Sequence, residues 1–140
     1  MEEIKVFLDT DVLISALLSQ KGASYKLIND TKFKKIISKT ITEETNEVSR
    51  RENINKGAVR AILKKTKITS LFLSKEKLLK TYSKYVFDEE DSHVVAGAYI
   101  SKSNFLLTHN IKHYHVIKIK NDLGIKVMRP GDFLQYLRSQ

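Results

Sequence analysis

Carboxylates at the junction between a strand-like run and a helix-like run are the first feature of this sequence that could do chemistry. Asp9, Thr10 and Asp11 follow the apolar segment 4–8 and precede the segment 12–18, in which apolar residues recur with helical spacing. An apolar run rich in branched and aromatic residues is typical of a buried parallel strand. Because open parallel sheets bind ligands beyond the carboxyl ends of their strands, Asp9 lies where a site would form. An isolated Asp at such a junction is better explained as the cap of the next helix.

Helical phase distinguishes Glu44 from its acidic neighbours. Ile41 and Val48 lie seven residues apart and share one face of a predicted helix, and Glu44 lies between them on that face. The other glutamates of the segment point elsewhere. Thr40 and Glu43 also fit an S/T-x-x-E capping box, which gives Glu43 a structural task. Glu44 alone lacks a structural explanation.

Asp91 occupies a similar place on another predicted helix. The apolar stripe of that helix is formed by Val94, Val95, Ala98 and Tyr99, and Asp91 lies three residues before the stripe on the same face. Taken alone, Asp91 is better explained as an acid that the positive end of the helix dipole favours. Together with the two acids above, it suggests convergence on one site.

A hard divalent cation is the ligand that Asp9, Glu44 and Asp91 would suit. Carboxylates on apolar faces need either basic partners or a cation. Mg²⁺ and Mn²⁺ take oxygen ligands from a few carboxylates and keep several waters. Thr108-His109-Asn110 follows a strand-like run at residues 104–107. If the sheet is parallel, Thr108 and Asn110 would add neutral oxygen atoms at the same edge of the sheet as Asp9.

Alternating strand-like and helix-like segments predict an α/β fold that positions these residues. Strands are expected at residues 4–8, 34–37, 68–73, 104–107 and 125–127. Helices are expected at residues 12–19, 25–31, 41–51, 56–65, 75–84, 92–102 and 131–138. No repeat, low-complexity tract or linker-like composition interrupts them, so we predict a single domain over residues 1–140.

The net charge of +9 is concentrated in the middle of the chain. Residues 48–87 hold eleven basic and two acidic side chains, and the rest of the sequence is balanced. Within this segment Lys56, Arg60, Lys64 and Lys67 recur at helical spacing and form a basic stripe. Such a stripe attracts polyanions, of which phosphate backbones are the commonest in cells. A solvated lysine-rich surface without a ligand explains the stripe equally well.

Composition excludes several other classes of function. The chain has no cysteine, which excludes disulfides, zinc-thiolate sites and cysteine nucleophiles. No segment approaches the roughly 18 apolar residues that span a bilayer, and the acidic start is unlike a signal peptide. We therefore expect a cytoplasmic protein without a membrane partner.

These motifs, in this order, resemble the PIN-domain ribonucleases, close to the VapC-type toxins of bacteria and archaea. The resemblance runs from about Ile4 to Leu137 and rests on segments that are weak alone but well spaced together. The matching segments are 7–19 (D-T-N/D-V-L-I start), Glu44 with Val48 and Arg51 (E-x-x-x-V-x-x-R), 91–98 (D-x-x-I-x-A-x-A), 105–110 (hydrophobic-T-x-D/N) and 128–134 (P-x-x-F-L).

The resemblance implies a three-layer α/β/α domain with a central, mainly parallel sheet. It also implies Mg²⁺- or Mn²⁺-dependent hydrolysis of RNA at a metal cluster of Asp9, Glu44 and Asp91. Thr108 would orient a water or a phosphate. Asn110 would be the fourth metal ligand, although many members have Asp there, and this difference puts a second metal in doubt.

The resemblance implies further roles and partners. Thr10 and Asp11 would contribute hydrogen bonds around the metal ligands, with Asp11 replacing the commoner Asn. The RNA backbone would be held by the basic residues Arg51, Lys56, Arg60 and Lys64. Such a toxin would form a homodimer and bind a small antitoxin protein encoded nearby.

Two other functions compete with this interpretation. Asp9 and Asp11 also resemble the D-x-D start of haloacid-dehalogenase-type phosphotransferases, but the Gly131-Asp132 pair lacks the second acid of that family's later motif. A PIN-like module that binds RNA or a protein partner, with a metal site degraded at Asn110, is the stronger alternative. Cleavage with divalent ions distinguishes it from an enzyme.

Overall fold

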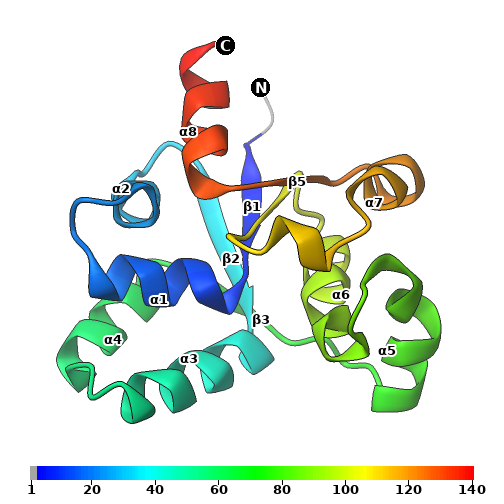
Figure 1. Cartoon of the computed structure of the whole chain (residues 1–140), viewed down its shortest axis with the longest axis horizontal. Helices are drawn as coiled ribbons and strands as arrows, with labels where there is room; N and C mark the ends of the chain where they lie inside the picture. Colours follow the sequence, from blue (N-terminus) through cyan, green and yellow to red (C-terminus); the bar gives the residue numbers. More distant parts are fainter. Residues whose placement is uncertain (1–2) are drawn as a thin grey trace.

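One parallel sheet organises the structure, a computed structural model that describes residues 3–140 (Figure 1). Its five strands lie in the order β3-β2-β1-β4-β5, and every neighbouring pair is parallel. The strands are β1 (Lys5–Leu8), β2 (Lys34–Ser38), β3 (Lys67–Thr69), β4 (Phe105–Leu107) and β5 (Lys126–Met128). Val6, Phe7 and Leu8 of the central strand are fully buried, as a parallel sheet with both faces covered requires.

Helices cover both faces of the sheet and give the predicted three-layer α/β/α fold (Figure 1). One face carries α1 (Thr10–Leu18), α2 (Ala23–Asn29), α3 (Lys39–Arg51) and α4 (Lys56–Leu63). The other carries α5 (Lys75–Tyr82), α6 (Ser92–Ile100) and α7 (Val116–Leu123). The last helix, α8 (Pro130–Arg138), packs against α2. Within residues 3–140, none of these helices has the length and apolar content that crossing a bilayer demands.

The strand order creates a crevice between β1 and β4. From β1 the chain continues to β2 and β3 on one side, and it returns through β4 and β5 on the other. Open α/β sheets bind ligands at such a switch point, beyond the carboxyl ends of the strands. Asp9 follows β1 and Thr108 follows β4, and the Asp9 amide donates to the Leu107 carbonyl over 3.0 Å, which holds the two strand ends together.

The segment after α4 differs from its prediction. The strand expected at residues 68–73 is only β3, and Phe72 beyond it is 94% exposed with a φ of 46°. The apolar residues 71–73 therefore belong to a connection to α5 and not to the sheet. The sequence does not predict helix α7, because Ile and Lys alternate at residues 117–120 and this pattern does not have the 3.6-residue period of a helix. Gly124 ends α7 with a φ of 71°.

Local helix details also correct the sequence interpretation. Ser38 caps α3 by accepting a hydrogen bond from the Ile41 amide over 3.1 Å, so the expected capping box of Thr40 and Glu43 does not form. Tyr99 is 48% exposed and does not belong to the inward stripe of α6.

Candidate functional site

A cleft of about 490 Å³ lies at the carboxyl edge of the sheet, where the switch point predicts a site. Asp9 reaches it from the end of β1, Glu44 from α3, Asp91 from the start of α6, and Asn110 from the loop after β4. All four residues that the sequence suggested as metal ligands therefore line one cleft. Glu47, which was expected to point elsewhere, lines it too.

Asp9 caps α1 and also presents its carboxylate to the cleft. Its Oδ1 accepts a hydrogen bond from the Thr10 amide over 2.8 Å. Its Oδ2 lies 2.9 Å from the Thr108 hydroxyl and 2.7 Å from the Tyr114 hydroxyl. Burial and the neighbouring Asp9 raise the pKa of Tyr114 far above its ordinary value, so Tyr114 remains a hydrogen-bond donor. Fixed donors thus orient this carboxylate before any ligand arrives.

Glu44 is held by two neighbours. The Thr10 hydroxyl donates to its Oε1 over 2.6 Å, and the Nε2 of His93 lies 3.2 Å from its Oε2. Burial opposes ionisation of Glu44, but the hydrogen bonds from His93 and Thr10 outweigh it and lower its pKa. Burial would lower the pKa of His93, yet the acids around it, chiefly Glu44, raise this pKa. The pair therefore favours carboxylate beside imidazolium.

Asp11 forms the floor of the site together with the loop after β4. Its carboxylate accepts hydrogen bonds from the His109 amide over 3.1 Å and from the Asn110 side chain over 2.9 Å. The Thr108 hydroxyl lies 3.1 Å away, between Asp11 and Asp9. Thr108 is fully buried, and its hydroxyl lies within hydrogen-bond distance of both carboxylates.

Repulsion among the carboxylates marks the cleft as a place for positive charge. Burial and the charge of Asp9 raise the pKa of Asp91 and raise that of Asp11 to about 6. Nδ1 of His113 lies 3.6 Å from the Asp91 carboxylate and offsets part of this charge. The oxygen donors fit a hard divalent cation chemically. Among residues 3–140, however, no three acidic or imidazole groups already stand together as a ligand set.

Comparison with known proteins identifies the family. The model of the PIN domain matches residues 5–112, which include the whole cleft apart from His113. The chain belongs to the PIN domain family. Comparison with curated proteins finds no match.

Solved structures similar to this PIN domain include three from toxin systems. VapBC2 of Rickettsia felis, bound to a DNA fragment from its promoter, is 14% identical, with 89% of this chain and 97% of that chain covered and a TM-score of 0.63. A toxin-antitoxin complex of Klebsiella pneumoniae is 16% identical, with coverages of 86% and 94% and a TM-score of 0.65. VapC20 of Mycobacterium tuberculosis, a sarcin-ricin loop cleaving toxin, is 15% identical, with coverages of 72% and 86% and a TM-score of 0.54. At these identities the likeness establishes the fold.

The basic residues suggested for nucleic-acid binding do not form one surface. Arg51 lines the acidic cleft of the PIN domain. Lys56 and Arg60 line a different hollow, between α3 and α4, and Lys64 at the end of α4 belongs to neither lining. The stripe inferred from helical spacing is therefore not one surface: Lys56 and Arg60 share the hollow, Lys64 lies outside it, and Lys67 belongs to β3.

His93 and Tyr114 are among the residues of the PIN domain site that were not identified from the sequence. His93 lies two residues after Asp91, at the start of α6, and its position beside an acid was the available signal. Tyr114 follows a 3₁₀ turn (Ile111–His113) that returns the chain to Asp9, a path that no local pattern indicates. Both fix carboxylates that the sequence did identify.

We expect Asp11→Asn to raise the free energy of unfolding of the metal-free PIN domain by about 1–3 kcal/mol at pH 7. The folded-state pKa of about 6 lies above the ordinary value of 3.8, so the folded chain binds more protons between these values. Stability therefore falls as the pH rises through this window, and Asn carries no charge to desolvate. The difference between the variant and the parent should vanish below about pH 4.

Urea unfolding in EDTA, at pH 7 and near pH 4, measures this difference. A variant less stable than the parent at pH 7 would mean that the hydrogen bonds accepted by the Asp11 carboxylate outweigh its burial.

Proposed function

We propose that this PIN domain is a metal-dependent endoribonuclease and the toxin of a toxin-antitoxin pair. The observation that carries the proposal is the convergence of Asp9, Glu44 and Asp91, from three separate elements, on one cleft at the switch point of the sheet. Burial and the charge of Asp9 raise the pKa of Asp91, which supports a site that gains from a bound cation.

Asp9, Glu44 and Asp91 would hold Mg²⁺ or Mn²⁺, with the Asn110 amide oxygen beside them. When bound, such an ion lowers the pKa of a coordinated water and offsets charge that develops on phosphoryl oxygens. The Asn110 nitrogen already donates to Asp11, which leaves its oxygen free to face the cleft. Three carboxylates and one amide supply less charge than four acids, so one ion is better supported than two.

The surrounding side chains position these groups. Thr108 and Tyr114 fix the Asp9 carboxylate, and Thr10 fixes that of Glu44. Arg51, in the wall of the same cleft, would bind a phosphate of the RNA backbone as a bidentate donor. The acids and this arginine are thus arranged so that a phosphodiester can meet both a cation and a guanidinium.

The similar structures support the toxin assignment. One is described as a toxin that cleaves the sarcin-ricin loop, and two are toxin-antitoxin assemblies. By analogy we propose a homodimer that is covered by a small antitoxin protein. Co-purification with the product of the adjacent open reading frame tests this partner.

We expect the purified protein to cleave an RNA stem-loop in its single-stranded loop when Mg²⁺ or Mn²⁺ is present, and to leave the RNA intact in excess EDTA. The measurement is gel electrophoresis of an end-labelled stem-loop beside a fully paired duplex of the same composition, which should resist cleavage.

RNA that is bound but not cleaved, with either ion, would contradict the ribonuclease and favour the weakened binding module. The Asn110 position is the specific reason to keep that alternative, since an amide stands where many members of the family carry an acid.

A further inference from the structure

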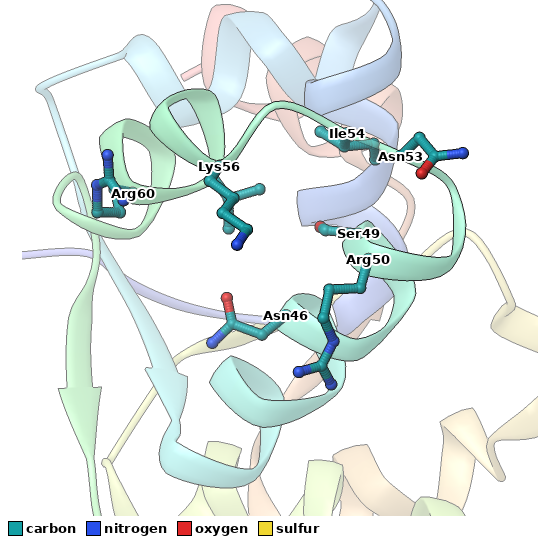
Figure 2. Close-up of a pocket in the computed structure, with 8 residues that line it drawn as sticks. Asn46, Ser49, Arg50, Asn53, Ile54, Lys56 and Arg60 are labelled. Carbon is teal, nitrogen blue, oxygen red and sulfur yellow. The ribbon is translucent and has the colours of Figure 1, made fainter.

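A second hollow, of about 640 Å³, lies between α3 and α4 (Figure 2). Ile54 and Val59 form the apolar part of its lining, and Asn46, Ser49, Arg50, Lys56 and Arg60 contribute polar and basic groups. In Figure 2 the Lys56 ammonium and the Asn46 amide point into the hollow from opposite helices, and Arg50 and Arg60 stand at its rim. None of the three basic side chains forms an ion pair with any residue from 3 to 140. The hollow is therefore a site of uncompensated positive charge.

Ser49 supplies a second, independent indication of a ligand. Its side chain is only 4% exposed, and its Oγ has no hydrogen-bond partner among the described residues. A buried hydroxyl without a partner costs free energy, so native proteins rarely keep one. Figure 2 shows this oxygen directed into the hollow between Lys56 and Asn46. A ligand with acceptor oxygens would satisfy it.

The α3–α4 turn fixes this arrangement. The Ile54 amide donates to the Ser49 carbonyl over 2.9 Å, and Asn53 adopts a φ of 55°, which asparagine tolerates at the end of a helix. Asn55 then caps α4 by accepting from the Ala58 amide over 3.0 Å. Lys56 is consequently the first residue of α4, where the helix dipole adds positive potential to its own charge.

We propose that this hollow is a phosphate-binding subsite that holds the RNA backbone at a distance from the acidic cleft. The inference rests on the proposed ribonuclease function. Helix α3 separates the two sites: Glu44 and Arg51 face the cleft, and Asn46 and Ser49 face the hollow. A strand that crosses α3 places one phosphate in the cleft and another in the hollow.

The donors of the hollow suit the phosphodiester of an RNA backbone. The cations, amide and hydroxyl that line the hollow can donate to both charged oxygens of a phosphodiester. An RNA backbone also repeats its charge along the strand, which matches basic groups on both sides of α3. An acidic polypeptide is the competing occupant, and the experiments below distinguish it.

Titration of the ¹⁵N-labelled protein with inorganic phosphate tests the subsite without RNA. The backbone amide resonances of residues 53–56 should shift until the site is saturated. Ser49→Ala should raise the dissociation constant for phosphate about fivefold, as the loss of one hydrogen bond predicts. Because this hydroxyl has no partner in the protein, the variant should melt no lower than the parent. Shifts unchanged by Ser49→Ala, or spread evenly over the lysine-rich surface, would overturn the subsite.

A salt series with fluorescent single-stranded RNA, in EDTA, tests whether the subsite serves the backbone. The combined change Arg50→Gln, Lys56→Gln and Arg60→Gln should lower the slope of log affinity against log salt by about 2, at roughly 0.7 per phosphate contact. The matched control is Lys75→Gln, Lys77→Gln and Lys80→Gln on α5, which removes the same charge from the opposite layer and should change the slope by less than about 1.

Equal slopes for the two triple variants would overturn the proposal. The proposal would also be overturned if the triple variant of Arg50, Lys56 and Arg60 lost affinity for polyglutamate but kept its affinity for RNA. Since no divalent ion is needed, these readouts are separate from cleavage: RNA that binds through the hollow but survives added Mn²⁺ would count against the ribonuclease and leave the subsite standing.

Discussion

Cleavage of RNA should fall by at least about 100-fold when Asp9 is replaced by Asn, because even residues that only hydrogen-bond to metal ligands change affinity or activity about 10- to 100-fold. The substitution keeps the shape of the side chain and one acceptor oxygen for Thr108 and Tyr114. It gives up only the hydrogen bond from the Thr10 amide, worth about 0.5–1.5 kcal/mol, so the fold should persist. Burial is the larger cause that raises the pKa of Asp11 and Asp91, and the charge of Asp9 adds to it. Removing the charge of Asp9 relieves this repulsion, and the metal-free variant should melt at the same temperature as the parent or higher.

Two measurements are needed together: initial cleavage rates with Mn²⁺ and thermal unfolding in EDTA. Glu43→Gln is the matched control, since Glu43 is exposed and lies outside the cleft on the same helix as Glu44. It should cleave at the parental rate, whereas Glu44→Gln should lose activity as Asp9→Asn does. Parental activity in Asp9→Asn would exclude a metal centre at this carboxylate.

The order of strands and helices and the carboxylates of the cleft could be predicted from the sequence, because each depends on a local pattern of residues. The apolar run that ends at Leu8 fixes the place of Asp9 at a strand end, and helical phase is enough to select Glu44 over Glu43. The parallel sheet then brings the ends of β1 and β4 together, so Asn110 follows from the same reasoning.

The side chains that hydrogen-bond to those carboxylates could not be predicted in the same way. Tyr114 reaches Asp9 across 105 residues of sequence, and His93 reaches Glu44 across 49. Such contacts arise from the packing of α6 and of the turn before α7, which no local period encodes. The division of the basic stripe has the same origin, because the α3–α4 turn decides which cations share a space with Ser49.

Substituting Gly97 by Ala should lower the free energy of unfolding by about 1–3 kcal/mol, the usual cost of overpacking a core. A Cβ at this position of α6 would lie 2.7 Å from Cε2 and 3.1 Å from Cε1 of Phe7, and closer still to its Cζ. Phe7 is fully buried in the central strand and cannot turn away freely. The gain of up to about 1 kcal/mol in helix propensity only partly offsets this clash.

The Gly97→Ala change has a clean control in Gly131→Ala on α8. There a Cβ would meet only the Ala23 side chain, at the ordinary contact distance of 3.8 Å, so that variant should be as stable as the parent or more stable. Adding Phe7→Leu to Gly97→Ala should recover stability relative to the sum of the single changes, which a double-mutant cycle in urea measures. Additive effects in that cycle would mean that α6 and β1 do not meet at these two residues.

The contact between Gly97 and Phe7 should also affect the acidic cleft, because Asp9 directly follows β1 and Asp91 directly precedes α6. The absence of a side chain at Gly97 lets α6 pack closely against Phe7 of β1, and we expect a change in this packing to move the Asp9 and Asp91 carboxylates relative to each other. We therefore expect Gly97→Ala to weaken Mn²⁺ binding several-fold in calorimetric titration, under conditions where the variant is fully folded. Undiminished Mn²⁺ affinity in a destabilised Gly97→Ala protein would show that the cleft adjusts independently of the packing between α6 and β1.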